Sequence, residues 1–174
     1  MVIHQDPATG EEHQSNRAQV LGIDEAFWRM AFSPGEMPAK GEVLLSRRVA
    51  DALGAAPGDE IALRVEQPGL LSRDAPLASN QEDPARRTWV TVKDVLTDEQ
   101  LGRFSLAANQ RIPYNVFLDR AWLQELVNLD GRANLLLTDA NATEADLTAA
   151  LAAAWQPEHL GLSFRRPVEG ILQM

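Results

Sequence analysis

The sequence predicts an α+β fold in which short strands alternate with amphipathic helices. Within residues 42–65, an apolar strand, a helix and a strand with period-two alternation follow one another. Residues 133–164 repeat the order strand, helix, strand, which is typical of a β-α-β unit. No repeat of fixed period is present, so the pattern does not indicate a solenoid.

Length and composition narrow the class of protein. The 174 residues suffice for one domain or two small ones. Because 16 Lys+Arg face 25 Asp+Glu, the net charge is −9, which argues against a nucleic-acid or anionic-membrane partner. The absence of cysteine excludes disulfides, cysteine nucleophiles and thiolate zinc sites. We find neither an apolar run of about 20 residues nor the basic and apolar regions of a signal peptide.

The N-terminal third begins with a polar stretch. Residues 1–16 predict a mobile N-terminal segment, in which His4 and His13 are expected to be solvated. Residues 17–23 predict a strand that runs into a helical turn, with Asp24 as its N-cap.

The clearest local pattern follows strand 42–45. Ser46 is a candidate N-cap and Gly54 a candidate terminator of one helix. The expected buried face of that helix comprises Val49, Ala50 and Leu53. A turn precedes the strand at 61–65, and strand 87–95 then places Val90 and Val92 on one face and a partly exposed Trp89 on the other.

Two long stretches, residues 67–86 and 97–115, show little periodicity. Loops of this length are uncommon without a function, and binding residues concentrate on loops held by a scaffold. We therefore predict a partner-binding surface there, while packing of these loops over their own core remains an equal alternative. The predicted partner-binding residues are Leu70, Leu71, Arg73, Asp74, Phe104 and Tyr114.

The last third predicts strand 116–118, a helix capped by Asp119, strand 133–137, a helix begun at Thr143, and strand 160–164. A capping box with Asp146 is expected at Thr143. The helix after Thr143 has an expected buried stripe of Leu147, Ala150, Leu151 and Ala154. The tryptophans expected in the core are Trp28, Trp122 and Trp155.

Catalytic signatures are missing from the sequence. The phosphate-binding patterns of nucleotide enzymes are absent, and His159 is the only histidine outside the first 16 residues. The neighbouring acidic pairs, Asp24 with Glu25 and Asp98 with Glu99, are expected to cap helices or face solvent. We therefore predict no catalytic residue, no cofactor and no metal site.

The order of segments resembles the extracytoplasmic domain of the MacB/FtsX-like permeases of ABC transporters, over about residues 17–155. Lys93 and Asp94 occupy the place where that family commonly has a glycine. The positions that carry the resemblance are Val20, Gly22, Ile23, Phe27 and Trp28; strand 43–45 with Ala50, Leu53 and Gly54; Gly58 and Asp59 with Ile61 and Leu63; Val90, Val92 and Val95; and segments 115–118, 123–124 and 134–136.

The resemblance implies a division into a mixed β-α-β porter-like part and a smaller inserted α+β subdomain. On this basis residues 17–115 are assigned to the inserted subdomain and residues 116–174 to the porter-like part. The first β-α unit of the porter and the membrane helices would lie outside this chain.

The same resemblance implies a non-enzymatic role on the periplasmic or extracellular face of the cytoplasmic membrane. Its partners would be the membrane-spanning part of the permease, the cytoplasmic ATPase acting indirectly, and an exported substrate or an envelope accessory protein. The alternative is a stand-alone soluble small-ligand module or enzyme with a small β-barrel-like core, because the motif around Gly58 and Asp59 also occurs in such barrels. A third alternative is an interaction scaffold for an envelope protein, without transport.

Overall fold

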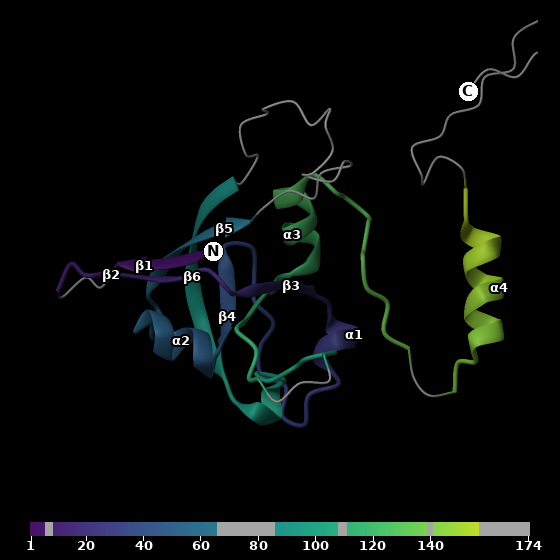
Figure 1. The fold of residues 1–174 in the computed structure, drawn as a ribbon, viewed down its shortest axis with the longest axis horizontal. Helices are drawn as coiled ribbons and strands as arrows, with labels where there is room; N and C mark the ends of the chain where they lie inside the picture. The colour runs from purple at the N-terminus through teal and green to yellow at the C-terminus, as the bar shows by residue number, and fades with distance from the viewer. Residues whose placement is uncertain (6–8, 66–85, 108–110, 139–140, 157–174) are drawn as a thin grey trace, which may run out of the picture. The chain divides into compact units, whose positions relative to one another are not determined.

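Seven strands of the computed structural model pair into one mixed sheet, in the order β2-β1-β5-β6-β4-β7-β3 (Figure 1). The structure describes residues 1–5, 9–65, 86–107, 111–138 and 141–156. The strands are β1 (Val2–Gln5), β2 (Glu12–Ser15), β3 (Gln19–Ile23), β4 (Glu42–Ser46), β5 (Glu60–Val65), β6 (Arg86–Leu96) and β7 (Asn115–Asp119). The helices are α1 (Glu25–Trp28), α2 (Arg47–Leu53), the 3-10 helix η1 (Asp98–Gln100), α3 (Arg120–Val127) and α4 (Glu144–Ala154). The predicted α+β class is confirmed.

The chain divides into two units, Met1–Arg132 and Ala133–Met174, and the first holds the whole sheet. The boundary expected between residues 115 and 116 falls inside this sheet, because β7 lies between β4 and β3. β7 pairs parallel with β3 and antiparallel with β4. Strands from both expected subdomains therefore share one sheet.

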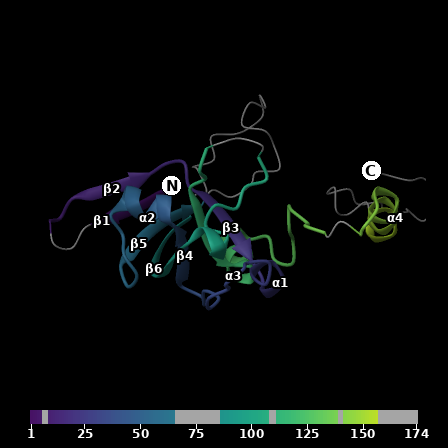
Figure 2. The ribbon, with the colours of Figure 1, turned by 90° about the horizontal axis from the view of Figure 1, so that it is seen from below.

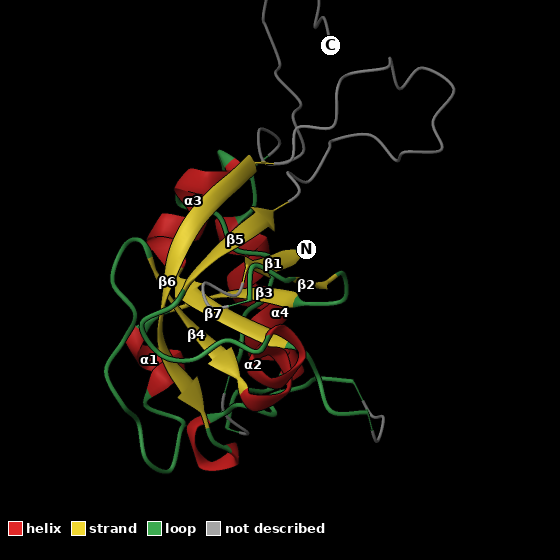
Figure 3. Cartoon of the chain, turned by 90° about the vertical axis from the view of Figure 1, so that its left-hand side faces the viewer, coloured by secondary structure: helices red, strands yellow, loops and turns green. Residues whose placement is uncertain are grey.

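The longest strand, β6, joins the two halves of the sheet. Its first half pairs antiparallel with β5, and its second half pairs parallel with β4 (Figure 3). A bulge between Val43 and Leu44 shifts the register against β6, and such bulges increase local twist. Among the described strands, β2 and β3 stand at the two ends of the order, so the sheet is open rather than closed into a barrel.

Two apolar cores lie on opposite faces of the sheet. Successive strand residues point to opposite faces, and Leu45 belongs to one core while Leu44 belongs to the other. Helices α2 and α3 cover the first face and contribute Leu53 and Trp122. Helix α1 covers part of the second face through Trp28. Trp89, on β6, is 57% exposed, as expected for a side chain opposite Val90 and Val92.

The N-terminal residues form an ordered hairpin, which extends from one end of the sheet (Figure 2). Strand β1 pairs with β2 on one side and with β5 on the other. Val2 is fully buried and His4 is 2% exposed, so the expectation of a mobile segment is wrong for residues 2–5 and 12–15. The polar composition of the hairpin predicted exposure. The apolar residues that pack against the hairpin belong mainly to β5 and α2, which are distant in sequence.

Local capping chemistry confirms several predicted helix ends. Asp24 accepts a hydrogen bond from the Phe27 N–H at 2.9 Å, and Asp119 accepts one from the Trp122 N–H at 2.8 Å. Gly54 ends α2 in the left-handed conformation, with φ of 62°. Ser46 precedes α2 as expected but does not cap it, since its hydroxyl accepts the Asn115 N–H instead.

The second unit departs from the prediction. The described residues of segment 133–137 are not in a strand, and strand 160–164 lies outside the described residues. Helix α4 begins with the predicted capping box of Thr143 and Asp146, but none of its residues is buried. Leu151 is 68% exposed and Trp155 is 53% exposed, so the expected buried stripe and core tryptophan are wrong here. Trp28 and Trp122 are buried, as predicted.

No helix in the described part of the chain has the length and apolar character to cross a membrane.

Glu42 anchors the turn that leads into β4. Its carboxylate accepts a hydrogen bond from the Ala39 N–H at 2.9 Å and lies 3.2 Å from the Lys93 Nζ. The Ala39 N–H, followed by Lys93, holds the pKa of Glu42 below its ordinary value. Because the folded state favours the charged form, the Glu42 carboxylate stabilises the fold above the unfolded-state pKa, and this stabilisation disappears as the pH falls through the folded pKa.

We therefore expect a Glu42→Gln variant to show a weaker acid dependence of stability. The decrease in unfolding free energy between about pH 6 and about pH 3 should be smaller in the variant than in the natural chain, because the variant has no carboxylate to protonate. Denaturant unfolding at several pH values measures this difference. A Glu36→Gln variant is the control, since Glu36 contacts the same Lys93 but is 88% exposed. Identical acid dependence in the natural chain and Glu42→Gln would contradict the assignment.

Candidate functional site

The six predicted partner-binding residues divide into three groups. Leu70, Leu71, Arg73 and Asp74 lie outside the described residues. Phe104 packs edge-on against Phe27, with 5.0 Å between ring centroids, and joins the core on the α1 face. Tyr114 lines a groove between helix α2 and the segment that follows β6. Of the two described residues, only Tyr114 is therefore part of a concave surface.

The groove has a volume of about 530 Å³, within the range of ligand sites in proteins. Its charged and aromatic side chains come from α2 and from residues 98–114, and we call it the arginine groove. Leu96 and Ile112 supply apolar wall. The residues that define the arginine groove are Arg47, Arg48, Asp51, Asp98, Arg103 and Tyr114.

One long-range hydrogen bond brings the two walls together. The Ser46 hydroxyl, just before α2, accepts the backbone N–H of Asn115 at 3.0 Å. The Tyr114 carbonyl also accepts the N–H of Gln19 at 2.7 Å, which connects it to β3. Tyr114 is therefore held near the start of α2 by the hydrogen bond of the next residue, Asn115, and is tied to β3 by its own carbonyl.

The guanidinium groups in the arginine groove have different neighbours. Arg48 lies over the Tyr114 ring, 4.8 Å from its centroid, which is a cation–π distance. Arg103 lies 3.3 Å from the Asp98 carboxylate, and both side chains are more than half exposed. Arg47 is exposed and lies in the first turn of α2, which carries no acidic residue. Positive side chains at this end of a helix are disfavoured by the helix dipole.

The second wall depends on a tight turn after β6. Thr97 and Gln100 form a capping box around η1, and Leu101 adopts a left-handed conformation with φ of 63°. Gly102 follows, and a Cβ atom there would lie 2.7 Å from the Thr97 carbonyl oxygen. Only glycine fits this place, so the turn that positions Arg103 depends on it. The Thr-x-x-Gln spacing was a signal in the sequence that the prediction of an irregular loop overlooked.

Asn115 fixes the far end of the same segment. It is fully buried, and its Nδ2 donates to the Phe104 carbonyl at 2.8 Å. Its Oδ1 is buried without a hydrogen-bond partner among the described residues. A polar residue at the start of a strand carries no local signal of such a role, so sequence reasoning missed it.

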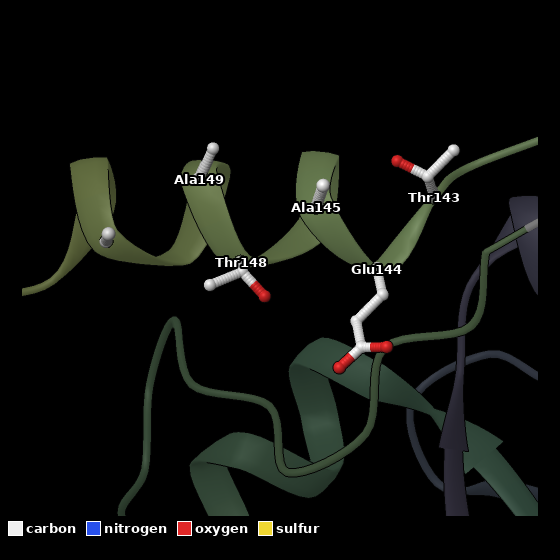
Figure 4. Close-up of a pocket in the computed structure, with 6 residues that line it drawn as sticks. Thr143, Glu144, Ala145, Thr148 and Ala149 are labelled. Atoms are coloured by element: carbon white, nitrogen blue, oxygen red, sulfur yellow. The ribbon is translucent and has the colours of Figure 1, made fainter.

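A second hollow follows helix α4, and the polar side chains that line it do not point toward a common position. Its lining comes from this helix alone, and in Figure 4 Ala145 and Ala149 project on one side while Glu144 and Thr148 project on the other. The Asp146 carboxylate accepts a hydrogen bond from the Thr143 hydroxyl, which lowers the pKa of Asp146. This hydrogen bond is part of the capping box of α4. This hollow is the surface of a helix and not a candidate site.

Two titratable side chains considered in the sequence analysis have structural partners. Asp24, which caps α1, also lies 2.8 Å from Arg120, and His4 is buried against α2. Within the described ranges, no three side chains of histidine, aspartate or glutamate gather in a metal-binding arrangement.

Compared with known proteins, the sequence matches no family model and no curated protein. What the arginine groove can bind therefore has to be inferred from its own residues and geometry.

Proposed function

We propose that the chain is a non-catalytic extracytoplasmic domain of a MacB/FtsX-like ABC transporter permease. In this role it binds an exported substrate or an envelope accessory protein and transmits the motion driven by a cytoplasmic ATPase. The order of segments in the sequence supports the family, and the arginine groove is the observation that supports binding. It presents two arginines on helix α2, with Arg103 and Tyr114 on the segment between β6 and β7, and arginine and tyrosine are enriched at protein interfaces.

The motif positions behind the resemblance support a scaffold role. Leu53 and Gly54 form the end of α2, and Gly58 lies within the turn before β5 with φ of 98°. Gly22 lies under α3, where a larger residue would meet the helix. Each of these residues meets a requirement of backbone or packing, which agrees with a domain whose rigidity serves transmission.

The alternative is a stand-alone module that binds a small ligand. A ligand of this kind would contact the same arginine and tyrosine side chains of the arginine groove. Membrane association of the complete gene product separates the two functions.

We expect the complete gene product, expressed with an affinity tag beside its neighbouring genes, to remain in the membrane after an alkaline carbonate wash. After detergent extraction it should copurify with a subunit that hydrolyses ATP. Protease added to the outside of spheroplasts should cleave within this domain, whereas a cytoplasmic marker stays intact. A gene product that stays in the soluble fraction and brings down no ATPase would contradict the permease and favour the small-ligand module.

Deletion of residues 68–84 is a further test of the same proposal. These residues lie outside the described ranges, between β5 and β6. We expect the shortened chain to unfold cooperatively, near the midpoint of the natural chain, while the complete transporter carrying the deletion loses transport. Transport that survives the deletion would exclude this segment as a contact surface.

A further inference from the structure

We infer that the arginine groove binds a short acidic peptide segment of a partner protein, with carboxylates on Arg47, Arg48 and Arg103. This inference rests on the proposed function, because it names the chemistry of the partner at the same groove. It follows from the charge of the groove, the neighbours of its guanidinium groups and its apolar wall.

The charge of the arginine groove is opposite to that of the chain. Three arginines and two aspartates line it, which leaves a positive balance in a protein of net charge −9. A long polyanion would be repelled by the surrounding negative field, while a short anionic segment meets mainly the local charge. The groove therefore selects against nucleic acid and for a few carboxylates.

The guanidinium groups are placed to receive carboxylates. Because Arg48 lies over Tyr114 at 4.8 Å from the ring centroid, its position is restricted before any ligand binds. The planar N–H edge of a stacked guanidinium can donate two parallel hydrogen bonds to one carboxylate. Arg103 is already beside a carboxylate, that of Asp98, which an incoming acidic side chain could replace or share.

Arg47 and Arg48 are also unfavourable for α2 itself. They occupy its first turn, where the helix dipole favours acidic residues, and the hydroxyl of Ser46 is directed to Asn115 instead of capping the helix. Residues that break a local stability rule are expected at functional sites. In our interpretation the side chains, and not the amides of this short helix, hold the ligand.

The apolar wall favours a peptide over an inorganic anion. Ile112 is 37% exposed and is the apolar side chain that a peptide can reach in the groove, because Leu96, which also lines it, is only 1% exposed. A peptide in which Asp or Glu is next to an aliphatic residue would contact both the arginines and the apolar wall, whereas inorganic phosphate would contact only the arginines. Asp51 and Asp98 would further disfavour the double charge of phosphate.

The test is a selection of phage-displayed random dodecapeptides on the immobilised chain. We expect enrichment of sequences in which Asp or Glu neighbours Leu, Ile or Val. The most enriched peptide, synthesised with a fluorescent label, is then titrated against the chain by polarisation. Binding should weaken by at least about 10-fold in an Arg47→Gln/Arg103→Gln variant, and also as salt rises, because removing each charge-assisted hydrogen bond weakens binding by about a factor of 10.

Arg17→Gln/Arg29→Gln is the matched control, since it removes the same charge from exposed arginines outside the groove. It should bind the peptide as the natural chain does. All of the substituted arginines are exposed, so equal unfolding midpoints are expected and are checked by circular dichroism. Excess inorganic phosphate, used as a competitor, should displace the peptide only weakly.

Selected peptides without acidic enrichment would overturn the inference, as would binding that is equal in the groove variant and the natural chain. Full displacement by millimolar phosphate would replace the acidic peptide with a simple phosphate site. These outcomes are independent of membrane association. If the chain binds acidic peptides but its gene product is soluble, this inference holds and the permease proposal is contradicted. If the gene product is a membrane protein but the chain binds no acidic peptide, the permease proposal holds and this inference is contradicted.

Discussion

Replacing His4 with phenylalanine is expected to lower the free energy of unfolding by about 1–3 kcal/mol, the cost of leaving a buried polar group without its partner. His4 lies on β1, is 2% exposed, and its Nδ1 is 2.9 Å from the carbonyl oxygen of Leu53. A carbonyl only accepts hydrogen bonds, so Nδ1 carries the hydrogen and donates. Leu53 is the last residue of α2, where carbonyls have no partner within the helix. Phenylalanine preserves the ring shape but removes this donor.

The second nitrogen of His4 faces the turn before β5. Its Nε2 lies 3.6 Å from the Asp59 carboxylate, which is beyond hydrogen-bonding distance, and that carboxylate accepts the N–H of Ala56 at 2.8 Å. The hydrogen bond of Nδ1 connects β1 with the end of α2, and the ring packs beside the turn before β5. Loss of His4 should therefore weaken the docking of the N-terminal hairpin on the rest of the sheet.

Denaturant unfolding of His4→Phe, His4→Asn and His13→Phe measures the effect. An asparagine amide can place its nitrogen near the position of Nδ1, so His4→Asn should recover part of the lost stability. His13 is the cross-strand neighbour of His4 but is 42% exposed, and its replacement should change stability by less than about 0.5 kcal/mol. Equal effects at His4 and His13 would show that the buried hydrogen bond contributes nothing.

Replacing Gly22 with alanine is expected to destabilise the fold by about 1–2 kcal/mol, the balance of overpacking against unfolded-chain entropy. Gly22 lies on β3 beneath α3, and a Cβ atom there would be 3.2 Å from the Cα of Arg120 and 3.0 Å from the Cδ2 of Leu123. The leucine end can move, but the helix backbone at Arg120 must shift as a whole. Overpacking of this kind costs about 1–3 kcal/mol, and the lower chain entropy of alanine in the unfolded state offsets up to about 1 kcal/mol of it.

Two further variants test whether the effect of Gly22→Ala is steric. Truncation of Leu123 to alanine removes the nearest of the three crowding atoms, the Cδ2, and keeps the Leu123 Cβ at 3.3 Å, so the double variant should be more stable than the sum of the single effects predicts. Gly35→Ala is the control, because its Cβ would meet only the flexible end of Gln100 at 3.4 Å and should change stability by less than about 0.5 kcal/mol. Strict additivity at Gly22 and Leu123 would argue against close approach of α3 to β3.

Helix ends were the most predictable features of this fold. Asp24, Asp119 and Thr143 each cap the helix expected of them, and Gly54 ends α2. Capping depends on hydrogen bonds within about four residues, so the sequence contains the whole interaction. Ser46 is the exception, because a residue 69 positions away offers its hydroxyl a better donor.

Strands and burial were less predictable, because their partners lie far along the chain. The hairpin of β1 and β2 is polar, and the pairing of β1 with β5 is what buries Val2 and His4. Segment 133–137 has the apolar character of a strand, but Leu136 is 77% exposed and is not in a strand. A strand needs a neighbouring strand for its hydrogen bonds, and local propensity does not supply one.

The candidate site shows the same division. Tyr114 was predicted as a binding residue and lies in the arginine groove, whereas Phe104 was predicted with it and is partly buried against the core. Arg47, Arg48 and Arg103 were not predicted, since scattered basic residues have no signature until α2 and the turn at Gly102 bring them together. The segment order in the sequence is also the basis of the proposed family.

The α+β class, the N-caps Asp24, Asp119 and Thr143, and the end of α2 at Gly54 could be predicted from the sequence alone, because these depend on short-range geometry and on the periodicity of apolar residues. Only the tertiary structure decided that the N-terminus joins the sheet, that β7 lies inside it, and that three arginines share one groove. Those outcomes depend on pairing and packing between residues distant in sequence, whose free energy no local pattern encodes.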